Sequence, residues 1–175
     1  MDTLKKYSLA GFLFIAALGT LWHFLYEWTN RNILVGLFCP VNESTWEHIK
    51  LLYFPGLFYI VFMGSRLKAM YPNILNALLA GLLAGCLSIP VLFYTYSGIL
   101  GKNLFVCDIL VFLVSIGVLF FTAKRLLPRE DLKNWDGILF FLTAALFAAF
   151  LVFSYLPLDI GLFWEPGSFV PSLSL

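Results

Sequence analysis

The sequence predicts an all-α fold, a polytopic transmembrane helical bundle with five spans. The chain has 175 residues, of which 61% are hydrophobic and only 12% charged, and its mean hydropathy is +0.91. A soluble domain of this size cannot bury so much apolar surface, so lipid must cover it. Five apolar stretches each approach the roughly 20 residues that a helix needs to cross the hydrocarbon core. They are residues 7–29, 45–63, 74–96, 104–122 and 137–156.

The basic residues alternate between the two ends of these spans. Eight of the eleven lie in the N-terminal segment and in the second and fourth loops: Lys5, Lys6, Arg66, Lys68, Lys124, Arg125, Arg129 and Lys133. The other three, Arg31, Lys50 and Lys102, are assigned to the alternate loops. By the positive-inside rule, this is a multi-pass protein of the cell membrane with its N-terminus in the cytoplasm and its C-terminus outside.

The chain is best interpreted as a single integral membrane domain, residues 1–175, because it contains no repeat, linker or low-complexity segment. Membrane lipids are the expected partners, and the sequence leaves protein partners unknown. A net charge of +1 gives no reason to expect nucleic-acid binding. Cys39, Cys86 and Cys107 form no CxxC pair, so buried thiols are expected, with a Cys39–Cys107 disulfide as the alternative.

The first span carries ionisable residues where they are costly. Residues 7–29 lack a signal-peptide cleavage site and should persist as a span. Thr20, His23 and Glu27 share one helical face, which we expect to point into the bundle. A His and a Glu one turn apart can ligate one metal, or the Glu can orient the imidazole. A hydrogen-bonded pair that locks helices together is the structural alternative.

A short apolar run, residues 33–40, precedes the second span and is too short to cross the membrane, so a re-entrant or interfacial segment is expected. It leads into residues 40–48 (PVNESTWEH). Ser44 and Glu47 match a capping box, so the helix should begin there. Glu47 and His48 lie about 100° apart around a helix and are not expected both to face one ion. Glu43, before the helix, has a freer direction.

The remaining spans contribute fewer polar residues. In the third span, Gly81 and Gly85 are suited to close helix packing, and Tyr94 lies near the outer end. Asp108 lies about four residues inside the fourth span, where a carboxylate is a functional candidate. The fifth span is apolar. The acidic, aromatic tail, residues 157–175, either folds over the outer end of the bundle or forms a loose terminus.

Residues 40–48, following a span that carries His23 and Glu27, together with residues 162–166 (LFWEP), resemble a family of small multi-pass membrane proteins of bacteria that forms a domain of unknown function. The resemblance extends over most of the chain. It implies a location in the bacterial cytoplasmic membrane and carries no activity with it.

These residues predict an outward-facing polar site within the membrane that is a candidate for a divalent metal, with zinc favoured by the ligand types. The candidate metal ligands are His23, Glu27, Glu43 and His48. The candidate catalytic residues are Asp108 and Glu47, and the supporting residues are Asn42, Ser44 and Tyr94.

The sequence leaves the activity open. A metal at this site would activate water against an ester or amide of a lipid, which predicts a lipid-directed hydrolase. No HExxH, GxSxG or Walker motif specifies a reaction. The alternatives are a protein that binds or transports an ion or small solute, and a non-catalytic structural subunit without a cofactor.

Overall fold

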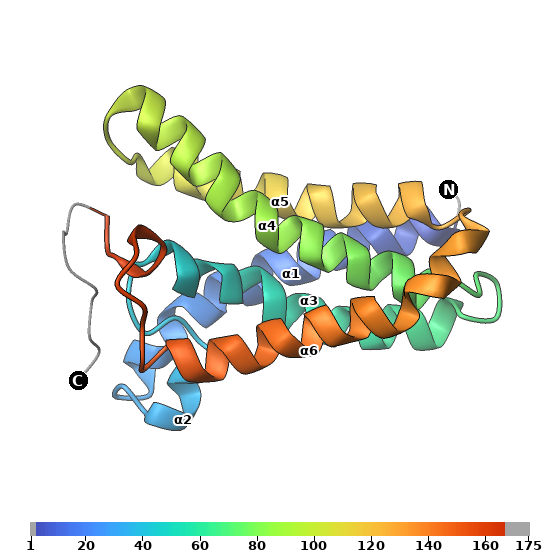
Figure 1. Cartoon of the computed structure of the whole chain (residues 1–175), viewed down its shortest axis with the longest axis horizontal. Helices are drawn as coiled ribbons and strands as arrows, with labels where there is room; N and C mark the ends of the chain where they lie inside the picture. Colours follow the sequence, from blue (N-terminus) through green and yellow to red (C-terminus); the bar gives the residue numbers. More distant parts are fainter. Residues whose placement is uncertain (1–2, 167–175) are drawn as a thin grey trace.

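The computed structural model describes residues 3–166, and its architecture confirms the predicted all-α bundle (Figure 1). The predicted tail, residues 157–175, therefore lies partly outside the described residues. The five long helices are α1 (Thr3–Trp28), α3 (Thr45–Leu67), α4 (Ile74–Leu100), α5 (Phe105–Leu126) and α6 (Asp136–Phe153). The short elements are α2 (Ile33–Gly36) and the 3-10 helices η1 (Glu130–Trp135) and η2 (Gly161–Phe163).

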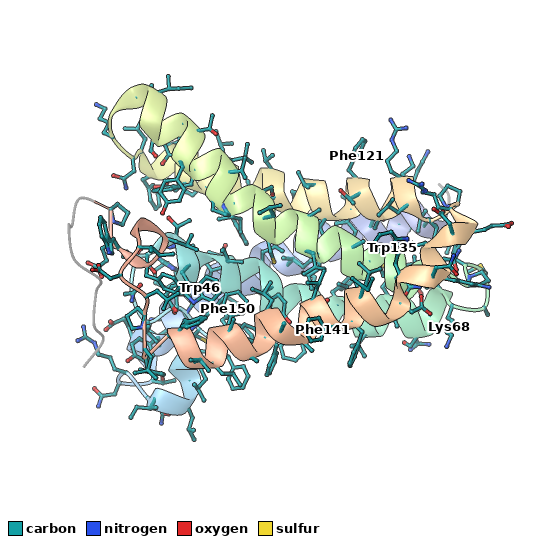
Figure 2. All side chains as sticks on the ribbon, viewed as in Figure 1. Trp46, Lys68, Phe121, Trp135, Phe141 and Phe150 are labelled. Carbon is teal, nitrogen blue, oxygen red and sulfur yellow. The ribbon has the colours of Figure 1, made fainter. Side chains whose placement is uncertain are left out.

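Five helices are long and apolar enough to cross a membrane, with α6 counted together with η1. Their outward faces carry large apolar side chains, such as Val61, Phe121 and Phe141, which are 69%, 61% and 68% exposed. Figure 2 shows Phe121 and Phe141 pointing away from the bundle. A surface of this kind is costly in water and matches lipid. The structure therefore indicates a membrane protein.

Helix α3 lies at the centre of the bundle. In its most apolar stretch 67% of the residues are buried, against 17% in α1. It packs against α1 on one side and α4 on the other, and α4 in turn packs along α5. Most residues of α3 are therefore shielded from lipid, including Lys50, which is fully buried. The assignment of Lys50 to a loop was wrong, because this lysine finds all its partners inside the protein.

Helices α4 and α5 approach closely through glycines, as the sequence predicts. A Cβ atom on Gly81 would lie 2.4 Å from the Leu119 carbonyl oxygen, and one on Gly85 would lie 2.9 Å from that of Ser115. One turn further, the Ser88 hydroxyl lies 2.8 Å from that of Ser115. Small residues at such contacts allow dispersion and hydrogen bonding between helices when lipid removes the hydrophobic driving force.

One end of the bundle, which we call the site end, gathers the C-terminus of α1, the N-terminus of α3, the α4–α5 turn and the C-terminus of α6 (at the left of Figure 1). The described part of the tail folds back onto it. Phe163 is buried, and its ring centroid lies 5.0 Å from that of Trp46. Tyr94 donates a hydrogen bond of 2.8 Å to the Gly161 carbonyl. Figure 2 shows Trp46 beside Phe150, so the first turn of α3 is enclosed by aromatic rings.

We expect Gly81→Ala to lower the thermal unfolding temperature of the detergent-purified protein. The added methyl group would meet the backbone oxygen of Leu119, which cannot rotate away, so the helices must separate at a cost of about 1–3 kcal/mol. Gly117→Ala in α5 is the matched control, because a Cβ atom there meets nothing within 4 Å. Equal unfolding temperatures for the two variants would contradict this account of the α4–α5 contact.

Candidate metal centre

The two histidines of the chain meet at the site end, although 24 residues separate them in the sequence. His23 lies near the end of α1 and His48 in the first turn of α3. Their ring centroids are 5.3 Å apart, and both side chains are partly buried, at 28% and 31% exposure. The pairing predicted from topology is therefore present in space.

A glycine sets the distance between the helices that carry these histidines. A Cβ atom on Gly19 of α1 would lie 2.6 Å from the carbonyl oxygen of Leu51 in α3, so only glycine permits this approach. His23 lies one turn beyond Gly19, and His48 lies one turn before Leu51. Because the helices run in opposite directions along the chain, these two offsets bring both imidazoles to the same level.

Glu43 joins the histidines from the turn that precedes α3. Its carboxylate oxygens lie 3.8 Å from His23 Nε2 and 3.4 Å from His48 Nε2. One ligand atom from each of the three residues lies within 4.8 Å of the other two. We call His23, Glu43 and His48 the His–Glu–His cluster. The Glu43 side chain is 63% exposed, so the cluster opens at the end of the bundle.

Hydrogen bonding selects the tautomer of one imidazole. His48 Nδ1 lies 2.9 Å from the Ser44 carbonyl oxygen, which can only accept, so Nδ1 carries the proton. In the neutral ring, Nε2 then presents a lone pair to Glu43. A backbone carbonyl that holds the second ring nitrogen is the usual support for a metal-binding histidine. His23 Nδ1 is buried and has no hydrogen-bond partner within residues 3–166.

The two separations that involve Glu43 can be compared with those of a shared metal and of direct hydrogen bonds. A hydrogen bond between a ring nitrogen and a carboxylate spans about 2.7–3.2 Å, shorter than both measured separations. Two ligand atoms on a tetrahedral zinc, each about 2.0–2.1 Å from the ion, lie about 3.3 Å from each other. The 3.4 Å contact of His48 matches this value, and the 3.8 Å contact of His23 requires only a small closing movement.

Two other glutamates predicted from the sequence lie outside the cluster: Glu27, a candidate metal ligand, and Glu47, a candidate catalytic residue. Glu27 pairs with Arg31 at 3.2 Å on the exposed surface, one turn apart on the chain. Glu47 is buried and pairs with Lys50 at 2.7 Å. Its backbone amide donates to the Ser44 hydroxyl, so the capping box is half formed, with the carboxylate used elsewhere.

Of the supporting candidates, two shape the turn that carries Glu43. Asn42 Oδ1 accepts a hydrogen bond of 3.0 Å from the Ser44 amide, and Ser44 is the N-cap of α3. Tyr94 belongs to the contact between α4 and the tail, through Gly161. Asn42 and Ser44 therefore support the cluster through the backbone, and Tyr94 closes the neighbouring surface.

Asp108 lies in the first turn of α5, at the same end of the bundle as the cluster. Cβ atoms added at Gly11 and Gly19 of α1 would meet Phe120 and Phe112 of α5. These contacts end at Phe112, and toward the site end the α4–α5 hairpin, which carries Asp108, diverges from α1 (Figure 1).

The Asp108 carboxylate is held at the N-terminus of α5. It accepts a hydrogen bond from the Tyr96 hydroxyl, which itself accepts one of 3.3 Å from the Leu104 amide. The carboxylate is thus positioned by the α4–α5 hairpin and is not one of the grouped ligands.

A buried ion pair, which the sequence analysis did not single out, fastens the segment before α3. Lys50 Nζ donates to Glu47 Oε2, to the Gly36 carbonyl at 2.9 Å and to the Cys39 carbonyl at 3.2 Å. Glu47 Oε2 also accepts the Val41 amide at 2.9 Å. The three protons of the ammonium group are therefore all used. The spacing of Glu47 and Lys50, three residues apart on one helical face, was the available signal.

We call residues 29–44 the α2 loop. Two further side chains hold it: Trp22 Nε1 donates to the Phe38 carbonyl at 2.9 Å, and the Tyr155 hydroxyl donates to the Ile33 carbonyl at 3.0 Å. Helices α1 and α3 and the segment after α6 thus all anchor this loop.

The cysteines in the structure are free thiols, which excludes the Cys39–Cys107 disulfide. Cys39 is 1% exposed within the α2 loop. Burial raises the pKa of its thiol to about 12, with Lys50 opposing this change and Glu47 adding to it. Cys39 is therefore protonated and unreactive at neutral pH.

The match to a known protein family covers almost the entire chain. The model of a family of unknown function, DUF6512, matches residues 1–168, which include all five long helices and the His–Glu–His cluster. No curated protein and no solved structure matches the chain. The resemblance to a family of unknown function is thereby confirmed, and the chain belongs to the family of unknown function DUF6512.

Proposed function

We propose that this protein is a membrane-embedded, zinc-dependent hydrolase that acts on an ester or amide bond of a lipid. The observation that carries the proposal is the convergence of both histidines of the chain with one carboxylate at the site end. Two imidazole nitrogens and one carboxylate oxygen form a ligand set typical of catalytic zinc, in which a fourth position remains for water or substrate.

The surroundings of the cluster favour a reaction at the membrane surface over a path through the bundle. Toward the middle of the membrane, the side chains of three helices include Ile15, Leu52 and Ile116, each with no exposed surface. Toward the outside, Glu43 is largely exposed. A substrate would therefore reach the cluster from the end of the bundle or from the adjacent lipid, and would leave the same way.

The proposed chemistry assigns distinct roles to the residues. The zinc would supply an activated water and polarise the carbonyl group of the substrate. His23, Glu43 and His48 would hold the ion. Asp108, a carboxylate at the same end of the bundle, would accept the proton of the attacking water and return it to the leaving oxygen or nitrogen as a general base. Each step conserves protons, and hydrolysis needs no further reactant.

Location and orientation complete the proposal. We place the protein in the bacterial cytoplasmic membrane, in agreement with the resemblance described above. The opposite end of the bundle carries most of the basic residues, including Lys68 (Figure 2) and, in the last turn of α5, Arg125. The positive-inside rule then directs the His–Glu–His cluster to the outer face.

Purified protein reconstituted with zinc should contain about one equivalent of the metal, measured by inductively coupled plasma mass spectrometry. His23→Ala, His48→Ala and Glu43→Gln should each weaken zinc binding by roughly 100-fold or more, because each removes a ligand and not merely an outer-shell partner.

Glu27→Gln is the matched control for this experiment. Glu27 lies one turn from His23 and carries the same charge as Glu43, but it pairs with Arg31. Zinc binding should therefore be unchanged in this variant. Wild-type protein without stoichiometric metal, or equal losses in the control and in the cluster variants, would contradict the metal site.

Asp108→Asn should separate binding from chemistry. We expect the variant to retain zinc and to lose about 100-fold or more of the rate at which fluorescent N-acyl and O-acyl lipids are cleaved in mixed micelles. Asp159→Asn, a carboxylate at the same end bound to the Trp164 indole, should cleave at the wild-type rate. Zinc-loaded protein that cleaves none of these lipids would argue against the hydrolase and leave a metal-binding protein.

A further inference from the structure

Of the three residues in the proposed cluster, Glu43 has the least rigid support. The histidines are carried by two packed helices, whereas Glu43 is 63% exposed and belongs to the α2 loop. An exposed loop carboxylate is normally mobile and pays conformational entropy to hold a metal. Its backbone must therefore be fixed by something else.

The hydrogen bonds around Glu43 show what fixes it. On one side, the Val41 amide donates to Glu47 Oε2. On the other side, Ser44 is held twice, by Asn42 Oδ1 at its amide and by the Glu47 amide at its hydroxyl. Glu43 thus lies between two anchored positions: the Glu47 carboxylate holds Val41, and the Glu47 backbone amide and Asn42 hold Ser44.

Glu47 is itself held by Lys50, and both side chains are almost completely buried, at 1% and 0% exposure. Lys50 also holds the preceding part of the loop through the Gly36 and Cys39 carbonyl groups. A single ammonium group therefore ties two turns of the loop to α3. No room remains at Gly36 for a larger residue, because a Cβ atom there would lie 2.2 Å from the Tyr155 hydroxyl.

We propose that Glu47 and Lys50 are positioning residues that act as a clamp: they hold the α2 loop against α3 so that Glu43 faces the two histidines. This inference rests on the proposed metal site and concerns residues that do not touch the metal. It assigns Glu47 a structural task in place of the catalytic role that the sequence suggested for it.

If Glu47 and Lys50 only stabilised the fold, replacing both would leave zinc affinity unchanged, whereas loss of a clamp would lower it. Replacing both residues together distinguishes the two roles. Replacing both members of a buried ion pair with apolar side chains of similar length is often neutral for stability, whereas removing one member leaves an uncompensated charge. The double variant Glu47→Met with Lys50→Met should therefore fold, yet it releases Val41, Gly36 and Cys39 from their anchors.

Two measurements report on the double variant. Zinc affinity should fall by about 10–100-fold, the range typical when the support of a ligand is lost. In a Cys107→Ser background, Cys39 should react with a soluble maleimide at least ten times faster than in the unsubstituted clamp, because the opened loop exposes its thiol. Replacing the exposed pair Glu27 and Arg31 with glutamines is the matched control and should change neither value.

Val41→Pro tests the same idea without altering the buried charges. Proline removes the amide hydrogen that Glu47 accepts, as well as fixing φ and replacing the valine side chain, so zinc affinity should fall while the ion pair remains. This variant decides the question if the double variant does not fold. Wild-type zinc affinity in a folded variant, or a Cys39 that stays protected in the double variant, would overturn the clamp. If the wild-type protein binds no zinc, the proposed function fails, and Cys39 labelling alone judges the clamp.

Discussion

The site end depends on two opposite charges buried in an apolar bundle. Glu47 and Lys50 are each excluded from solvent, in a setting where an unpaired charge costs several kcal/mol. The lysine satisfies every donor it has, and two of its three acceptors are backbone carbonyls of the α2 loop. A loop path that moved Gly36 and Cys39 away from α3 would leave two of the three ammonium protons without acceptors, so the observed path is strongly favoured.

This constraint explains how residues of unequal rigidity can form one site. Close packing at Gly19 sets the level of the two histidines, and the hydrogen bond from His48 to Ser44 sets one ring orientation. Neither device reaches Glu43. The direction of the Glu43 side chain follows from the path of the α2 loop. The Glu47–Lys50 pair, which lies outside the cluster, therefore determines whether Glu43 faces the two histidines.

The sequence was sufficient for the helices because each spanning helix satisfies its own backbone hydrogen bonds, so length and composition identify it. It also predicted that both histidines lie at one end. It could not select among the carboxylates there, because the choice depends on side-chain rotation about α3 and on the path of an irregular loop. Glu47 and His48 point in different directions, as their 100° separation implies. The pairing of Glu47 with Lys50 was missed because Lys50 was assigned to a loop.

The structural alternative, in which the histidines only lock helices together, can be weighed against the bonds that already do so. Helices α1 and α3 are joined by the contact at Gly19 and by the hydrogen bond of 2.7 Å from the Tyr59 hydroxyl to the Tyr7 carbonyl. Across the cluster, by contrast, nitrogen and oxygen stand 3.4–3.8 Å apart, longer than a typical hydrogen bond. Lone pairs that face one another at that distance repel unless a proton or a cation lies between them. A lock would bring these atoms closer, whereas a metal would hold them near the distances found here.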